Sequence, residues 1–280
     1  MKPLRHVLTT LTSRRAFAFA AFLTILGGVR WPAPLQAKEP GPAKPTVVMV
    51  HGAFAGSSSW NPVISRLLAK GYPVVAVANP LRGLGSDSKY LSAVMAGIAG
   101  PIILVGHSYA GMVISNAATG NSKVKALVYV SGLAPEAGET TAALVAKLPG
   151  STLGPTLAPP VVLPGGAKEL YILQDKYNAQ FCADVPAADA GLMAATQRPI
   201  IEAAFSEAAG PPAWKTIPSW FLYGSLDKNI PAAVHAFMSR RAGAKKVVEV
   251  KGASHVVMIS HPDALVRLID DAATTSLAAN

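Results

Sequence analysis

The sequence alternates between short apolar runs and longer amphipathic stretches, and this alternation constrains the fold more than any other feature. Six apolar runs are candidate strands, at residues 47–50, 74–77, 102–105, 127–130, 220–223 and 247–250. Nearly every residue in them is apolar, as expected of parallel strands covered on both faces. Helical patterns lie between them, near residues 59–70, 88–99, 109–120, 231–242 and 262–277. The alternation predicts an α/β protein with a doubly wound, mostly parallel sheet.

One long stretch interrupts this alternation. Residues 135–213 contain ten of the 23 prolines, helix-like patches at 139–148 and 187–208, and no convincing strand. We therefore expect a helical cap inserted between two strands of the sheet, with residues 46–134 and 214–280 forming the core.

The first 37 residues have the pattern of an export signal. Arg14 and Arg15 precede an apolar run over residues 16–29, and the segment ends in a small residue, Ala37. This order is typical of a secretory signal, and the arginine pair resembles a Tat signal. We expect cleavage after Ala37, a proline-rich linker over residues 38–45, and a periplasmic or secreted bacterial protein. An uncleaved anchor or a general secretory signal fits the same residues.

Charge and cysteine content argue against several classes of protein. Residues 1–37 hold five of the 25 basic residues and no acidic one, so half of the net charge of +10 lies there. The other basic residues are scattered, which argues against a nucleic-acid partner. The single cysteine, Cys182, excludes a disulfide framework and a cysteine-based zinc site. No apolar run reaches the roughly 18 residues of a membrane span.

A serine follows the third predicted strand in a pattern that suits a nucleophile. The segment Gly106-His107-Ser108-Tyr109-Ala110-Gly111 comes directly after residues 102–105 and begins a predicted helix. A serine on such a sharp strand-to-helix turn exposes its hydroxyl, and the helix N-terminus adds partial positive charge. Ala110 stands where a second glycine is usual, and alanine still fits a crowded turn. A helix N-cap is the structural alternative for Ser108.

Two further residues supply the chemistry that Ser108 needs. A serine hydroxyl is a weak nucleophile unless a base accepts its proton and a carboxylate orients that base. Asp227 follows the strand at 220–223, and His255 follows the strand at 247–250. The order Ser, Asp, His along the chain is the one expected with a serine on this turn. The structural alternatives are a turn or N-cap residue for Asp227 and a buried loop residue for His255.

The other histidines of the body are weaker candidates for the base. His261 stands at an apparent helix start, in His261-Pro262-Asp263. His107 is fixed beside the nucleophile and is expected to point away from it. His235 lies in the middle of a predicted helix and is expected at the surface.

A glycine-rich loop after the first strand completes the predicted site. The segment His51-Gly52-Ala53-Phe54-Ala55-Gly56 lets backbone amides approach a substrate oxygen. An oxyanion hole at this place uses one N–H from this loop, that of Ala53, and the N–H after the nucleophile, that of Tyr109. Neither of the glycine patterns that bind phosphates occurs, so a nucleotide site is not expected.

On these residues the sequence resembles the α/β-hydrolases, and more narrowly their methylesterase and hydroxynitrile lyase group. The resemblance covers most of residues 46–278 and is strongest over 47–53, 106–108 and 251–262. It implies a Ser/Asp/His triad, no cofactor, and a small helical cap over a largely apolar pocket. Hydroxynitrile lyases of this group usually carry Thr where Gly52 stands and Lys where Val256 stands. The resemblance therefore favours the esterase branch.

The predicted function is a serine carboxylesterase that acts on small, uncharged esters through an acyl-enzyme. A lactone or amide hydrolase or a perhydrolase with the same triad, and a non-catalytic protein that binds a small ligand, are the alternatives. Seven apolar residues are candidates for the pocket wall, although core packing is the commoner role of each: Leu144, Leu148, Leu153, Leu157, Met193, Trp214 and Met258.

Overall fold

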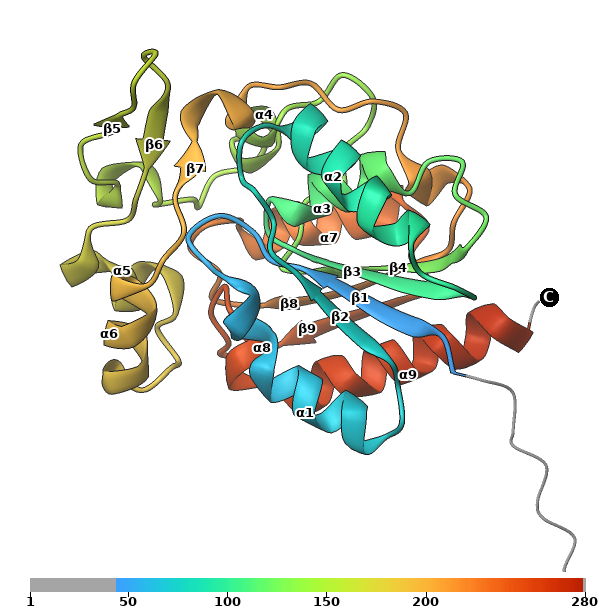
Figure 1. The fold of residues 1–280 in the computed structure, drawn as a ribbon. Coiled ribbons are helices and arrows are strands. Elements are labelled where there is room, and N and C mark those ends of the chain that lie inside the picture. The colour runs from blue at the N-terminus through green and yellow to red at the C-terminus, as the bar shows by residue number, and fades with distance from the viewer. Residues whose placement is uncertain (1–43, 279–280) are drawn as a thin grey trace, which may run out of the picture. The chain divides into compact units, whose positions relative to one another are not determined.

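The computed structural model describes residues 44–278, so the predicted export signal over residues 1–37 lies outside the described residues. Six parallel strands form one sheet in the order β2-β1-β3-β4-β8-β9 (Figure 1). They are β1 Thr46–Val50, β2 Val74–Val77, β3 Ile102–His107, β4 Val124–Val130, β8 Ser219–Gly224 and β9 Lys246–Val250. All six predicted strands are confirmed, and so is the doubly wound parallel sheet.

Helices cover both faces of this sheet (Figure 1). One face carries α1 Asn61–Ala69, α8 Val257–Ser260 and α9 Pro262–Ala278, and the other carries α2 Leu84–Ala96, α3 Ala110–Ala117 and α7 Ala232–Arg241. A short 3-10 helix, η1 Ser57–Trp60, precedes α1. The five predicted helices are present with shifted ends. None of the helices within residues 44–278 has the length and apolarity to cross a membrane.

The α2 helix begins four residues before the predicted start, and Asp87 ties its first turn to the preceding loop. The carboxylate of Asp87 accepts a hydrogen bond from the backbone N–H of Arg82 (3.1 Å), and the N–H of Asp87 donates to the carbonyl oxygen of Gly83 (2.9 Å). An acidic residue in the first turn favours a helix start. The apolar pattern used for the prediction carries no such signal.

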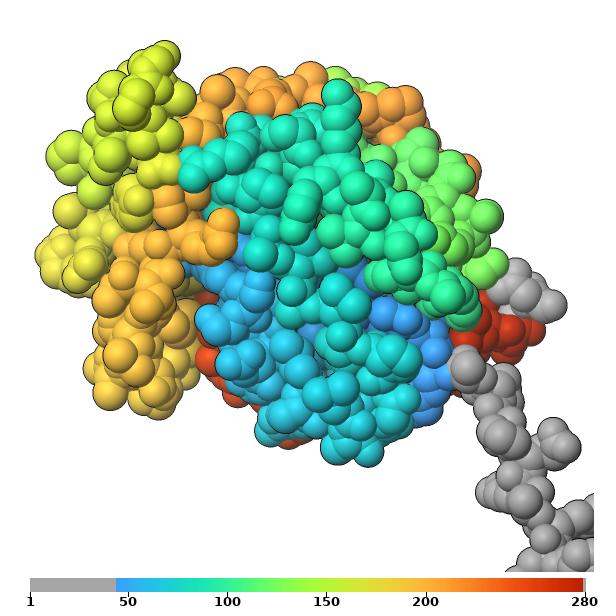
Figure 2. Space-filling model, viewed as in Figure 1, coloured from blue at the N-terminus to red at the C-terminus, as the bar shows by residue number. Residues whose placement is uncertain are grey.

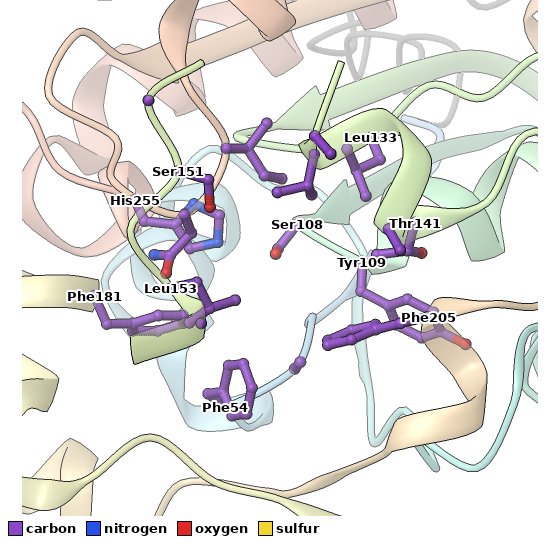
Figure 3. Close-up of a pocket in the computed structure, with 18 of the residues that line it drawn as sticks. Phe54, Ser108, Tyr109, Leu133, Thr141, Ser151, Leu153, Phe181, Phe205 and His255 are labelled. Carbon is purple, nitrogen blue, oxygen red and sulfur yellow. The ribbon is translucent and has the colours of Figure 1, made fainter. Parts of the chain in front are cut away.

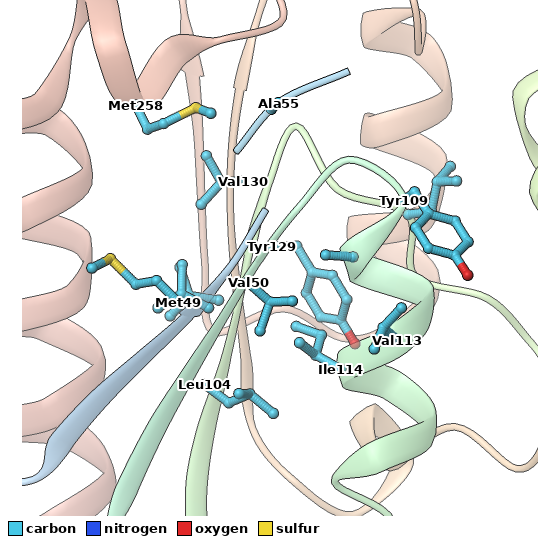
Figure 4. Close-up of a cluster of buried hydrophobic side chains, with 14 of the residues drawn as sticks. Met49, Val50, Ala55, Leu104, Tyr109, Val113, Ile114, Tyr129, Val130 and Met258 are labelled. Carbon is cyan, nitrogen blue, oxygen red and sulfur yellow. The ribbon is translucent and has the colours of Figure 1, made fainter. Parts of the chain in front are cut away.

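The core lies between the sheet and its helices. Every residue of β3 is buried, as the apolar run over residues 102–105 implies. Figure 4 shows Val113 and Ile114 of α3 on the side of the sheet that Val50 and Tyr129 occupy. The Tyr129 ring stacks on Phe221 with ring centroids 4.6 Å apart. The candidate site described below lies at the carboxyl ends of these packed strands.

Residues 135–213, here called the cap, lie between β4 and β8 and add no strand to the main sheet. The cap contains α4 Thr141–Val145, η2 Gly154–Thr156, α5 Gln174–Phe181, α6 Ala187–Ala195, η3 Glu202–Phe205 and η4 Ala213–Lys215, the last continuing past the cap. It also contains a three-stranded antiparallel sheet of β5 Val161–Val162, β6 Lys168–Leu170 and β7 Ile200–Ile201. The expectation of no strand here is wrong, because strands of two or three residues are too short to show an alternating pattern. In Figure 2 the cap, yellow to orange, covers one end of the core.

Candidate active site

Ser108 lies on the turn between β3 and α3 with its backbone in the left-handed region, at a φ of +56°. Such a conformation is strained for a residue with a side chain and is held by its surroundings. The turn is crowded: a Cβ atom at Gly106 would lie 2.8 Å from the carbonyl oxygen of Ala110, and one at Gly111 only 2.2 Å from that of Leu133. The small residues predicted around Ser108 are therefore required by the packing.

Asp227 and His255 are in direct contact after the ends of β8 and β9. The Oδ2 atom of Asp227 accepts a hydrogen bond from Nδ1 of His255 at 2.7 Å. Its Oδ1 atom accepts from the backbone N–H groups of Asn229 (2.8 Å) and Ile230 (2.9 Å). Burial opposes ionisation of this carboxyl, but His255 and the hydrogen bonds outweigh it and lower the pKa of Asp227 below its usual range. Asp227 is therefore an ionised acceptor that holds His255.

The other ring nitrogen of His255 faces Ser108, the predicted nucleophile. Because Nδ1 donates to Asp227, Nε2 is the ring nitrogen left to accept a proton. This atom is buried and has no hydrogen-bond partner among residues 44–278. His255 and Ser108 line the same cavity, and Figure 3 shows their side chains facing a common space. The two are not hydrogen-bonded to each other, a contact that enzymes often tighten only when substrate binds.

The prediction that His235 lies at the surface is wrong. Its side chain is fully buried, and its Nε2 atom lies 3.2 Å from Oδ2 of Asp227, the oxygen that His255 also contacts. The ring stacks on Tyr223 with centroids 4.9 Å apart. The spacing in α7 holds a signal for this burial, since His235 precedes the buried Met238 by three residues and so shares its helix face. Asp227 is thus held by two histidines.

His107 and His261 do not take the place of His255. His107 is buried and its Nε2 atom lies 3.2 Å from the carbonyl oxygen of His255. Burial lowers the pKa of His107 well below its usual value, so its neutral ring donates to that carbonyl and supports the His255 loop. His261 lies 3.8 Å from Asp184 and lines a cavity other than that of Ser108.

The predicted oxyanion donors, Ala53 and Tyr109, meet beside Ser108. Both residues line the cavity. Within the described chain, the backbone N–H of neither residue donates to a protein acceptor. The loop and the turn approach closely, because a Cβ atom on Gly52 would lie 2.6 Å from Cβ of Ser108 and 3.2 Å from the nitrogen of Tyr109. The two amides are placed to receive an oxygen next to the serine.

His51 holds the peptide that carries the Ala53 N–H. Its Nε2 atom accepts from the backbone N–H of Asn79 (3.1 Å), so its Nδ1–H donates to the carbonyl oxygen of Gly52 (2.9 Å). Burial is the main cause that lowers the pKa of His51 to about 4, which keeps the ring neutral in this arrangement. The carbonyl of Gly52 and the N–H of Ala53 belong to one planar peptide unit, so this bond orients the donor.

Phe54 joins this loop to the cap. Its backbone is in the left-handed region, at a φ of +61°. Its N–H donates to the carbonyl oxygen of Arg198 (2.9 Å), and its carbonyl oxygen accepts from the hydroxyl of Tyr177 (2.7 Å). Both partners belong to the cap. The residue after Ala53, a predicted oxyanion donor, is therefore held by two cap residues.

The cavity above Ser108 has a volume of about 410 Å³. Three of the candidate leucines line it, Leu148, Leu153 and Leu157. The other four candidates do not: Leu144, Trp214 and Met258 are buried in the core, and Met193 lines a separate cavity. The sequence offered no separate signal for the aromatic and core residues that share the wall, among them Phe54, Leu133, Phe181 and Phe205. None of the residues that line the cavity is Lys, Arg, Asp or Glu.

Comparison with known proteins identifies the family and the fold. The model of the alpha/beta hydrolase family matches residues 47–268. The alpha/beta hydrolase nvfD of Aspergillus novofumigatus is 27% identical over 253 residues, which cover 82% of this chain and 97% of nvfD. The crystal structure of polyneuridine aldehyde esterase superposes with a TM-score of 0.71 at 21% identity, over 81% of this chain and 98% of that one. A methylesterase from Arabidopsis superposes with a TM-score of 0.66 at 18% identity, over 82% and 99%.

Proposed function

The chain belongs to the alpha/beta hydrolase family, and from that premise we propose that it is a serine esterase acting on small, uncharged carboxylic esters. The observation that carries the proposal is the position of His255. One nitrogen of its ring is bound to the ionised Asp227, and the other faces the cavity that Ser108 lines. This is the arrangement that a serine nucleophile and its base require.

The proposed mechanism has two halves. In the first, His255 takes the hydroxyl proton of Ser108 while Oγ attacks the ester carbonyl carbon, and the N–H groups of Ala53 and Tyr109 bind the oxyanion. Each such donor contributes about 3 kcal/mol in comparable sites. The intermediate collapses, the C–O bond to the alcohol breaks, and His255 gives its proton to the departing oxygen. In the second half, water attacks the acyl-enzyme by the same route and releases the acid.

The residues that line the cavity favour uncharged substrates. Its lining is mainly apolar, and no charged Lys, Arg, Asp or Glu side chain faces it to compensate a substrate charge. A volume of about 410 Å³ suits a small organic molecule. The two structural relatives named above are an esterase and a methylesterase, in agreement with the branch that the sequence resembles.

Position 52 supports ester hydrolysis over cyanohydrin cleavage. The lyases that the sequence resembles usually carry threonine there, and the close approach of Gly52 to Ser108 leaves no room for its Cβ atom. Val256, at the position of their lysine, is buried and provides no cation for a leaving cyanide.

We also propose export to the periplasm or beyond, on the arginine pair Arg14-Arg15 and the apolar run after it. The test is cell fractionation of the full chain beside a variant in which both arginines are replaced by lysine. The full chain is expected in the periplasmic or secreted fraction, and the variant in the cytoplasm.

The catalytic proposal is tested with p-nitrophenyl esters from acetate to decanoate, comparing the wild type with Ser108→Ala. Wild-type protein is expected to hydrolyse the shorter esters, and the variant to lose at least about 1,000-fold in kcat. Circular dichroism controls for folding. Full activity in a folded Ser108→Ala would contradict the mechanism, and a folded wild type inactive on every ester would favour the binding role.

A further inference from the structure

One buried amide group on the cavity wall has an unpaired donor. Asn229 lies two residues after Asp227, is only 4% exposed, and lines the cavity above Ser108. Its Nδ2 atom has no hydrogen-bond acceptor among residues 44–278. Buried polar groups are nearly always hydrogen-bonded, so an unpaired one at a binding cavity points to a ligand.

A hydrogen-bond network fixes which atom of this amide is free. The hydroxyl of Thr152 donates to Oε1 of Gln180 at 2.8 Å, which places the Gln180 Nε2 donor on the other side. That Nε2 donates to the carbonyl oxygen of Lys228 (3.0 Å) and to Oδ1 of Asn229 (3.0 Å). A flipped Asn229 would bring two N–H groups together, so Oδ1 must face Gln180.

This network leaves Nδ2 on the edge of the Asn229 amide opposite its bond to Gln180. Gln180 does not line the cavity, whereas Asn229 does. The backbone N–H of Asn229 donates to Oδ1 of Asp227, whose Oδ2 holds His255. The free donor therefore belongs to the same loop as Asp227, and its amide is oriented by the bond to Gln180.

We propose that Asn229 determines specificity by donating a hydrogen bond from Nδ2 to a second, neutral oxygen of the substrate. This inference rests on the proposed esterase function and narrows it. The preferred substrates are esters that carry a further ketone, ester or ether oxygen near the scissile group. A neutral acceptor fits because the donor is an uncharged amide and no Lys or Arg lines the cavity to bind a carboxylate.

The test uses two pairs of esters matched in size. Methyl 4-oxopentanoate and methyl pentanoate differ by an oxygen in the acyl part, and 2-methoxyethyl acetate and butyl acetate differ by one in the alcohol part. Wild-type protein is expected to prefer the oxygenated member of at least one pair by about tenfold or more in kcat/KM. The pair that shows the preference tells which side of the scissile bond Asn229 contacts.

Asn229→Leu removes the donor at similar volume, and Gln180 keeps its bond to the Lys228 carbonyl. This variant is expected to lose the preference, so that kcat/KM becomes similar for the two members of the pair, whatever the rate on the oxygen-free ester. Thr141→Val is the matched control, since the buried Thr141 hydroxyl is also unpaired within the described chain and lies across Ser108 from His255 (Figure 3). It is expected to keep the preference.

The outcomes separate this inference from the esterase proposal. An active wild type with no preference in either pair, or a preference that survives Asn229→Leu, overturns the role of Asn229 and leaves the esterase intact. If the preference is lost in Thr141→Val but kept in Asn229→Leu, the role of Asn229 is also overturned and the esterase proposal stands. A folded wild type that hydrolyses neither these four esters nor the p-nitrophenyl esters overturns the esterase proposal itself. Asn229→Ala provides the same comparison if the leucine variant does not fold.

Discussion

Gly52 lies against Ser108 so closely that a Cβ atom added to the glycine would be 2.6 Å from Cβ of the serine. The same atom would lie 2.7 Å from the carbonyl oxygen of His107. Both neighbours belong to the strained turn at the end of β3, and neither is the far end of a flexible side chain. The loop after β1 and the turn that carries Ser108 therefore form a single packed unit.

Gly52→Ala is expected to lower kcat by about 100-fold, because the added methyl group must separate the Ala53 amide from the turn and so weaken the oxyanion hole. The measurement is kcat on p-nitrophenyl acetate with the melting temperature alongside. Ala53→Gly changes the same loop without adding an atom and is expected to keep most of the activity. Unchanged kcat in a folded Gly52→Ala would show that the close approach has no catalytic role.

His235→Leu is expected to lower kcat by about tenfold with little change in KM, since His235 contacts Asp227 and does not line the cavity. Loss of this hydrogen bond leaves the buried carboxylate less firmly held and raises the pKa of Asp227 towards its usual value. His235→Gln retains a side-chain donor and is expected to recover most of the rate. Equal losses in both variants would mean that His235 acts through packing and not through Asp227.

Stability is expected to fall as the pH decreases from about 7 to 4. The pKa of His51 is about 4 in the folded protein, below its ordinary value of 6.5, so between these values the unfolded chain binds a proton that the folded chain does not. For His51 alone, the free energy of unfolding at pH 5 is about 2 kcal/mol lower than at pH 7. His107, whose pKa is also lowered, contributes in the same direction, whereas Asp227 contributes only at lower pH.

Urea unfolding at pH 5 and pH 7 measures this effect. His51→Gln is expected to show a smaller difference between the two pH values than the wild type. His261→Gln replaces a partly exposed histidine outside the Ser108 cavity and serves as the control. If His51→Gln kept the full wild-type difference, the loss of stability would come from other groups.

Cys182 is expected to be unreactive in the native protein. Its side chain is fully buried, and burial is the main cause that raises the pKa of its thiol to about 11. Iodoacetamide at pH 8 should leave esterase activity unchanged and modify the thiol only after unfolding in urea. Rapid labelling of the folded chain would show that α5 opens in solution.

The core could be predicted from the sequence because its strands are long enough to show a pattern. The run at residues 102–105 is apolar throughout and belongs to a strand buried on both faces. The cap gave no such signal. Its β7 strand, Ile200–Ile201, pairs with β6 and lies within a stretch predicted to be helical, so tertiary contacts decide its structure.

The residues of the candidate site also differ in whether the sequence predicts them. Ser108, Asp227 and His255 each follow a strand, and parallel strands bring such positions to one edge of the sheet. His235 lies within a helix and has no such marker, and Asn229 follows the same strand as Asp227 without any pattern that singles it out. The roles of these two residues depend on side-chain contacts, of His235 with Asp227 and of Asn229 with Gln180. The order of residues along the chain does not encode such contacts. The cavity wall was predicted only in part, since it depends on how the cap lies over the core.

The bonds of Phe54 to Arg198 and Tyr177 have a consequence for engineering this enzyme. The cap supplies most of the residues that line the cavity, so exchanging it is a route to a changed substrate range. Here an exchanged cap would also remove both partners that hold the backbone of Phe54, next to the oxyanion donor. A chimera would therefore lose rate as well as change specificity, unless the graft retains an acceptor for the Phe54 N–H and a donor for its carbonyl.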